Sequence, residues 1–137
     1  VECDPGVRAR IPDGVEVVAA TWQAYLADAN DNFPIHRFSA VFFDDFPIVA
    51  TPSRGSRWRT FLEAVGPFLH AGSRVVGYCC DAERLRAALP YGYWLERVSP
   101  FEVTPPDDCP YVSEAAGDRC FVVVIGFDPH GVYEPGA

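Results

Sequence analysis

Lysine and methionine are both absent from the 137 residues, and all 11 basic residues are arginine. Against 19 acidic residues, they leave a formal net charge of −8. Nucleic acids and anionic membrane surfaces are bound by cationic faces, so this charge argues against both as partners. Because the chain starts at Val1 without an initiator methionine, we expect it to be a processed or truncated piece of a longer protein.

Long hydrophobic runs and targeting segments are missing too. No apolar run approaches the ~18 residues of a transmembrane helix, and no signal peptide is visible. The five cysteines lack the paired spacing of a zinc site, so we expect no metal. Adjacent Cys79 and Cys80 are expected to be inert packing residues. Free thiols are typical of a reducing compartment, and we therefore expect a soluble, cytoplasmic protein.

The apolar pattern predicts one α/β domain, since 49% of the residues are hydrophobic. Five extended segments are expected, at residues 15–20, 38–43, 74–79, 91–103 and 120–127. Three helices are expected, at residues 22–29 after a Thr21 cap, from Ser56 to about Pro67, and at 82–89 after an Asp81 cap. Residues 4–6 and 70–72 are predicted to be turns.

This alternation of strands and helices predicts a mostly parallel sheet with helices on both faces. The continuous apolar run at residues 38–43 is typical of a strand buried on both faces. No helix separates the last two strands, so they should pair as a hairpin and the last strand should run antiparallel. Residues 128–137 are expected to form a C-terminal tail.

Polar side chains follow several of the predicted strands. Ligands of open α/β sheets sit at the carboxyl ends of strands. Glu2 could bind ribose hydroxyls there, or it could be a solvated terminal carboxylate. Asp44 and Asp45 could bind a cation or accept a proton, or they could cap the next helix.

Several segments, in order along the chain, resemble the guanidinoacetate N-methyltransferase family and its bacterial and arginine-modifying relatives. The most specific are Phe43-Asp44-Asp45-Phe46-Pro47, similar to the family's Tyr-Asp-Thr-Tyr-Pro, and residues 103–111, similar to its Val-Pro-Pro-Ala-Asp-Cys-Arg-Tyr-Tyr loop. Weaker likenesses are Val1-Glu2-Cys3 to Ile-Glu-Cys, residues 20–23 to Gly-Leu-Trp-Glu, and residues 74–79 to Val-Leu-Thr-Tyr-Cys. Together they span roughly residues 1–127.

The resemblance implies a Rossmann-like class I methyltransferase sheet that uses S-adenosyl-L-methionine, with the first βα unit and its glycine loop expected before residue 1. It implies cofactor binding by Glu2, Trp22 and Gln23. It also implies catalysis by Asp44, which would bind and deprotonate a small guanidino or amino substrate. The expected substrate-binding set is Asp44, Asp45, Tyr78, Cys80 and Asp81.

The sequence also departs from the family pattern. Cys80-Asp81-Ala82 replaces an Asn-Leu-Thr segment that holds the substrate carboxylate, and Asp81 would repel an acidic substrate. Gln23 replaces an acidic residue, and Asp45 replaces a threonine. The alternatives are an inactive methyltransferase-like scaffold or interaction module, and a small-molecule carrier or sensor. A sheet without its first strand should need a second copy or a complementing N-terminal segment.

Overall fold

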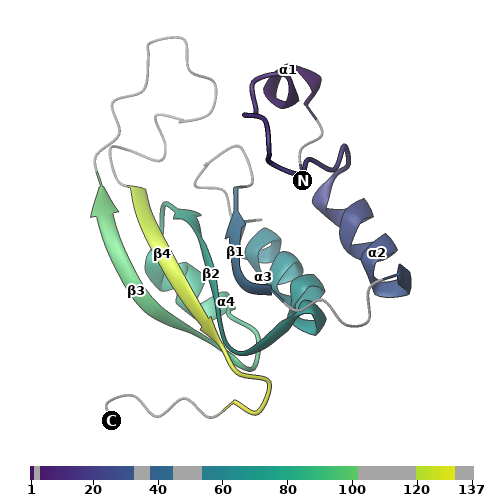
Figure 1. Cartoon of the computed structure of the whole chain (residues 1–137). Coiled ribbons are helices and arrows are strands. Elements are labelled where there is room, and N and C mark those ends of the chain that lie inside the picture. Colours follow the sequence, from purple (N-terminus) through teal and green to yellow (C-terminus); the bar gives the residue numbers. More distant parts are fainter. Residues whose placement is uncertain (2–3, 33–37, 45–53, 102–119, 132–137) are drawn as a thin grey trace. The chain divides into compact units, whose positions relative to one another are not determined.

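The structure is a computed structural model that describes residues 1, 4–32, 38–44, 54–101 and 120–131. The chain forms two compact units, Val1–His36 and Arg37–Ala137, each of which is described by itself. Figure 1 labels the helices and strands of both units.

The first unit contains two helices. Asp4 caps the short helix α1 (Pro5–Arg8), because its carboxylate accepts hydrogen bonds from the backbone N–H groups of Gly6 and Val7 at 2.7 and 3.2 Å. The turn predicted at residues 4–6 is therefore the start of a helix that is one turn long. Helix α2 (Trp22–Asn32) begins after Thr21, whose hydroxyl accepts a hydrogen bond from the Ala24 N–H at 3.2 Å. The predicted Thr21 cap is confirmed, and the helix is longer than expected.

The strand predicted at residues 15–20 is wrong, since no residue of this segment is in a strand. Its β-branched residues favour extended structure, but a strand is stable only when a neighbouring strand satisfies its backbone groups. The described residues of the first unit contain no such neighbour.

The second unit is built on a mixed sheet of four strands in the order β1-β2-β4-β3. The strands are β1 (Phe38–Phe43), β2 (Leu69–Cys79), β3 (Tyr93–Phe101) and β4 (Cys120–Phe127). Strand β1 pairs parallel with β2, and β4 pairs antiparallel with both β2 and β3. The hairpin pairing of the last two strands and the reversed direction of the last one are therefore confirmed, and β4 lies between β2 and β3.

Strand β2 begins at Leu69, earlier than predicted, and therefore includes residues 70–72, where a turn was expected. Between Phe38 and Ala40 the β1 partner jumps from Leu69 to Arg74, so the intervening residues bulge out of the register. The buried Ser73 fixes this bulge, because its hydroxyl donates to the Phe38 carbonyl at 2.7 Å and accepts from the His70 N–H at 3.0 Å. The residues predicted to form a turn therefore form a bulge, which interrupts the pairing of β1 with β2 but does not end β2.

Two helices pack on the sheet. Helix α3 (Arg54–Val65) ends at a 3₁₀ turn, η1 (Gly66–Phe68), that contains Pro67. This confirms that the helix stops there, although it starts before the predicted cap at Ser56. Helix α4 (Ala82–Ala88) is capped by Asp81 as predicted.

Helices α3 and α4 lie on the same face of the sheet, behind the strands in Figure 1. The expectation of helices on both faces also concerns α2, which belongs to the first unit, so it stays a prediction. The core forms between the sheet and helices α3 and α4. Along each strand, every second side chain points toward these two helices and meets side chains of α3. The core includes Phe43, Phe61, Leu62, Val75, Val123 and Ile125. The Phe43 ring stacks on Phe61, with 3.8 Å between ring centroids, and meets Trp58 edge-on.

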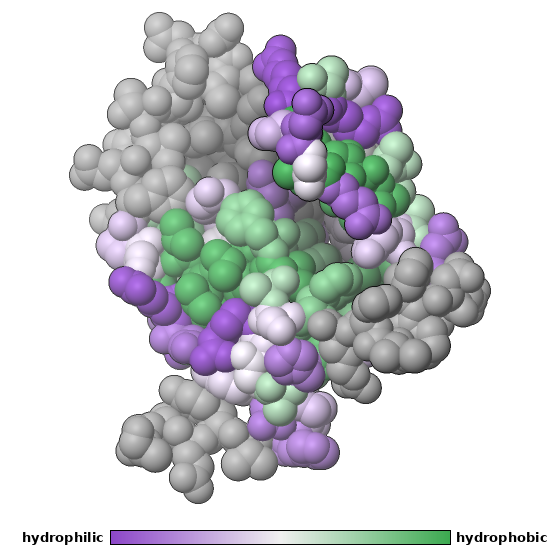
Figure 2. All heavy atoms as spheres, in the orientation of Figure 1, coloured by the Kyte–Doolittle hydropathy of each residue, from purple (hydrophilic) through white to green (hydrophobic). Residues whose placement is uncertain are grey.

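The opposite face of the sheet carries an apolar patch that is only partly covered. Strand register places Phe42, Val76, Tyr78, Val122 and Val124 on this face. Phe42 is 57% exposed, and the other four are half-buried. Figure 2, in the orientation of Figure 1, shows the hydrophobic surface they form on the side turned toward the viewer. We call it the open face.

Candidate functional site

Strands β1 and β2 end at the same edge of the sheet, because they run parallel and Phe43 pairs with Gly77. Asp44 directly follows β1, and one further step in the register brings it opposite Tyr78. Cys80 and Asp81 follow β2. This carboxyl edge therefore gathers Asp44, Tyr78, Cys80 and Asp81, four of the residues singled out from the sequence. Both carboxylates are exposed.

Contacts on both sides hold Tyr78 in place. Its ring meets Phe42 edge-on, with centroids 5.6 Å apart and planes at 85°. Its backbone carbonyl accepts a hydrogen bond from the Trp58 indole at 3.3 Å. Helix α3 thus anchors the end of β2, which gives Asp44 and Tyr78 a rigid base.

Asp81 already has a structural role. One of its carboxylate oxygens accepts a hydrogen bond from the Arg84 N–H at 2.9 Å, which caps α4. A carboxylate at a helix N-terminus is also favoured by the helix dipole. The side chain is exposed, so its use as a substrate ligand would have to coexist with the cap.

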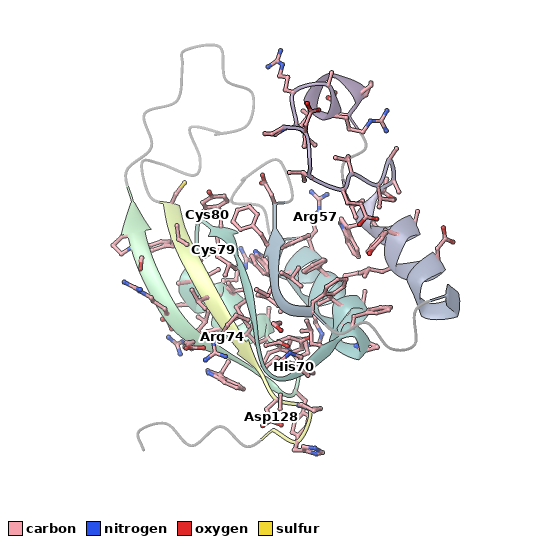
Figure 3. All side chains as sticks on the ribbon, viewed as in Figure 1. Arg57, His70, Arg74, Cys79, Cys80 and Asp128 are labelled. Atoms are coloured by element: carbon pink, nitrogen blue, oxygen red, sulfur yellow. The ribbon has the colours of Figure 1, made fainter. Side chains whose placement is uncertain are left out.

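The adjacent cysteines have different surroundings, and Figure 3 shows both at the end of β2. Cys79 is buried, and this burial raises the pKa of its thiol to about 12, an effect to which Cys80 adds and which a backbone hydrogen bond from Asp81 partly offsets. A neutral thiol is a poor nucleophile, so Cys79 is the inert packing residue that the sequence predicts. Cys80 is only half-buried.

The other predicted site residues belong to other parts of the chain. Trp22, half-buried, and Gln23, exposed, open helix α2 in the first unit. Glu2 and Asp45 lie outside the described residues, as does the loop at residues 102–119 that carries the Pro-Pro-Asp-Asp-Cys motif.

Two residues of this region were missed as parts of a site. Trp58 is 9% exposed in the core, and its indole donates a hydrogen bond to the backbone of Tyr78, 20 residues away in sequence. Cys120 is the first residue of β4. The residues that lie beside it can be predicted only when the pairing of β4 with β2 is known. No local pattern in the sequence signals either role.

The described residues contain no group of three or more histidine, cysteine or acidic side chains arranged to hold a metal ion. Within the same residues, no helix has the length and apolar character needed to cross a membrane.

Comparisons with known proteins define the class of fold. No family model matches the chain, and no curated protein matches it. Among solved structures, the chain is similar in fold to a protein described as a putative methyltransferase, and its mixed α/β sheet is consistent with a methyltransferase-like fold.

The similar structure is that of "SMU.776, a putative methyltransferase complexed with SAH". The TM-score is 0.53 at 9% sequence identity, and the match covers 78% of this chain. It covers 30% of the other chain, so the present chain spans less than a third of that protein's length. At this identity the likeness concerns the fold.

Proposed function

We propose that the chain belongs to an S-adenosyl-L-methionine-dependent N-methyltransferase that acts on a small guanidino or amino compound. The observation that carries this proposal is the placement of Asp44 beside the end of β2, on a sheet similar to that of a protein solved with SAH. Ligands of open α/β sheets bind at this edge.

The residues at the carboxyl edge suit a cationic substrate. Asp44 and Asp81 supply carboxylate oxygens, and a carboxylate can bind a guanidinium through two parallel hydrogen bonds. Tyr78, on the neighbouring strand, supplies a hydroxyl and an aromatic ring. An edge with this charge favours amines and guanidines over acidic substrates.

The cofactor would supply an electrophilic methyl group on a sulfonium. The chain's own part of the chemistry is to orient the substrate nitrogen and to take its proton. A guanidinium has no free lone pair, so Asp44 would both position it and accept the proton. Asp45, the next residue, would raise the basicity of Asp44 by like-charge repulsion. Glu2, Trp22 and Gln23 are proposed to contact the ribose and adenine.

Isothermal titration calorimetry with S-adenosyl-L-homocysteine tests cofactor binding by the intact gene product. We expect saturable binding, and no binding at millimolar ligand would remove the enzyme proposal. In a methyl-transfer assay with guanidino and amino compounds, Asp44→Asn should abolish turnover and leave cofactor binding unchanged. Asp28→Asn, which changes an exposed carboxylate of α2, is the matched control. Retained turnover in Asp44→Asn would refute the catalytic role.

The open face favours a second candidate function, an interaction module that has kept the fold without the chemistry. An exposed apolar patch on a sheet is typical of a surface that contacts another polypeptide. On this alternative, the chain forms a homo-oligomer or associates with a complementing segment. Light scattering that shows a stable monomer, together with binding of the cofactor analogue, would reject it in favour of the enzyme.

A further inference from the structure

Three cysteines lie close together where β2 ends and β4 begins. Cys79 is the last residue of β2 and Cys80 follows it (Figure 3), and Cys120 is the first residue of β4. All three are free thiols. The proposed methyl transfer does not use their sulfur chemistry, so an inference about it goes beyond that function and stands independently of it.

The antiparallel ladder between β2 and β4 ends beside Cys80 and Cys120. It pairs Arg74 with Gly126 and continues without interruption to its last pair, Cys79 opposite Phe121. The residues that adjoin this last pair are Cys80, at the bend that follows β2, and Cys120, the first residue of β4. The two cysteines therefore lie at the same end of the ladder. Disulfides form between Cα atoms about 4.4 to 6.8 Å apart, a range that includes the roughly 4.5 to 5.5 Å between opposed residues of antiparallel strands.

Cys79, the third cysteine, is not expected to take part in this disulfide. Successive side chains of a strand point to opposite faces, so Cys79 points away from the face of its neighbour Cys80. Its register partner is Phe121, and its side chain is 8% exposed on the side that packs against the helices.

Burial gives the thiols of Cys80 and Cys120 different chemical roles. Cys120 is 1% exposed, and its pKa is raised first by this burial and then by the nearby Cys80. The pKa of Cys79 is likewise raised by burial and by both Cys80 and Cys120, so all three thiols are neighbours and only the strand geometry distinguishes Cys80 as the partner of Cys120. Cys80 is half-buried, so a small oxidant in solution reaches it before it reaches Cys120.

We infer that Cys80 and Cys120 form a reversible cross-strand disulfide when the protein meets an oxidant of the peroxide class. The Cys80 thiolate attacks a peroxide oxygen, the O–O bond breaks, and Cys80 becomes a sulfenic acid as one water leaves. The Cys120 sulfur then attacks the Cys80 sulfur and expels the hydroxyl as a second water. In total, two thiols are oxidised and one hydrogen peroxide is reduced to two waters.

This bond would tie the carboxyl end of β2 to the start of β4. The residue after Cys80 is Asp81, which caps α4, so the crosslink fixes the backbone next to that cap. The loop it closes contains α4 and β3. Closing a long loop restricts the unfolded chain, so oxidation should raise the thermal unfolding midpoint by several degrees.

Disulfide mapping of the full chain tests the inference directly. The reduced protein is treated with a small excess of hydrogen peroxide, its remaining thiols are alkylated, and it is digested without reductant for mass spectrometry. We expect one crosslinked peptide pair that joins Cys80 to Cys120, lighter than the two free peptides by two hydrogen atoms. Dithiothreitol should restore both thiols.

Cysteine-to-alanine variants supply matched controls. Cys79→Ala should form the crosslink as the unmodified chain does, whereas Cys80→Ala and Cys120→Ala should lose it. The mapping of the unmodified chain decides the question even if Cys120→Ala fails to fold. A bond between Cys79 and Cys80, a bond to Cys3 or Cys109, a bond between two chains, or thiols that remain fully alkylatable would each overturn the inference.

Discussion

The two faces of the four-stranded sheet differ in what covers them, although they share the same strands. On the face toward α3 and α4, side chains from all layers interlock, and Leu62, Val75, Val123 and Ile125 are inaccessible to solvent. On the open face, Phe42, Val76, Val122 and Val124 of the same strands are also apolar but stay partly exposed, and Arg74 and Arg97 lie on that face as well. Hydrophobic patterning alone therefore does not say which face of a strand is packed.

Consecutive residues of β1 offer the strongest test of this contrast. Phe43 is 6% exposed and stacks on Phe61, whereas Phe42 is 57% exposed on the open face. We expect Phe43→Ala to lower the free energy of unfolding by about 3 to 5 kcal/mol, because it leaves a cavity. Phe42→Ala should cost about 1 kcal/mol, mainly its ring contact with Tyr78. Urea denaturation of both variants measures the difference, and equal losses would mean that the open face is covered in solution.

Two glycines, one on each face of the sheet, allow the packing of the two faces to be compared. A Cβ on Gly77 would lie 2.5 Å from the Phe43 carbonyl oxygen and 2.8 Å from the Trp58 ring. On the open face, the atoms nearest to a Cβ on Gly126 would be those of the Trp94 ring, at 2.4 Å. The obstacle at Gly126 is therefore a half-buried side chain, whereas the obstacle at Gly77 includes the backbone of β1.

We therefore expect Gly77→Ala to destabilise the fold by about 3 kcal/mol. Gly126→Ala should cost about 1 kcal/mol, because the lower entropy of the unfolded alanine chain offsets part of the clash. Thermal unfolding followed by circular dichroism compares the two, and the reverse order would contradict the assignment of the faces.

A smaller effect concerns the tyrosine that joins β3 to α3. The Tyr93 hydroxyl donates a hydrogen bond of 2.6 Å to the Leu62 carbonyl, and its pKa is raised because the side chain is buried. Tyr93→Phe should cost about 1 to 2 kcal/mol, since the buried carbonyl loses its donor. The control Tyr91→Phe removes a bond to the His130 carbonyl from a residue that is 80% exposed. It should change the unfolding midpoint little.

A last expected effect is a pH dependence carried by Cys79. Its pKa rises from 9.0 to about 12 on folding, so above pH 9 the unfolded chain loses a proton that the folded chain keeps. Stability is then complete below pH 9 and falls by about 1.4 kcal/mol per pH unit as the pH rises toward 12. Unfolding measured from pH 8 to 10.5 should show a shallower decline in Cys79→Ala. An unchanged slope would mean that this thiol is hydrated in the folded protein.

The sequence by itself determined the local elements that depend on short-range chemistry. The runs at residues 38–43 and 120–127 became β1 and β4 with the predicted bounds, and Thr21 and Asp81 cap the helices that follow them. The reason is that apolar periodicity and capping hydrogen bonds involve residues only a few positions apart. The sequence also singled out Asp44 and Asp81 as residues that follow strands.

Tertiary structure decided everything that depends on which strand lies beside which. It left residues 15–20 without a partner strand, inserted β4 between β2 and β3, and covered only one face of the described sheet with α3 and α4. The same pairing set Asp44 beside Tyr78 and brought the end of β2, which Cys80 follows, beside the start of β4 at Cys120. Such contacts join residues tens of positions apart, and their register follows from packing and backbone hydrogen bonding across the whole sheet, which no local pattern encodes.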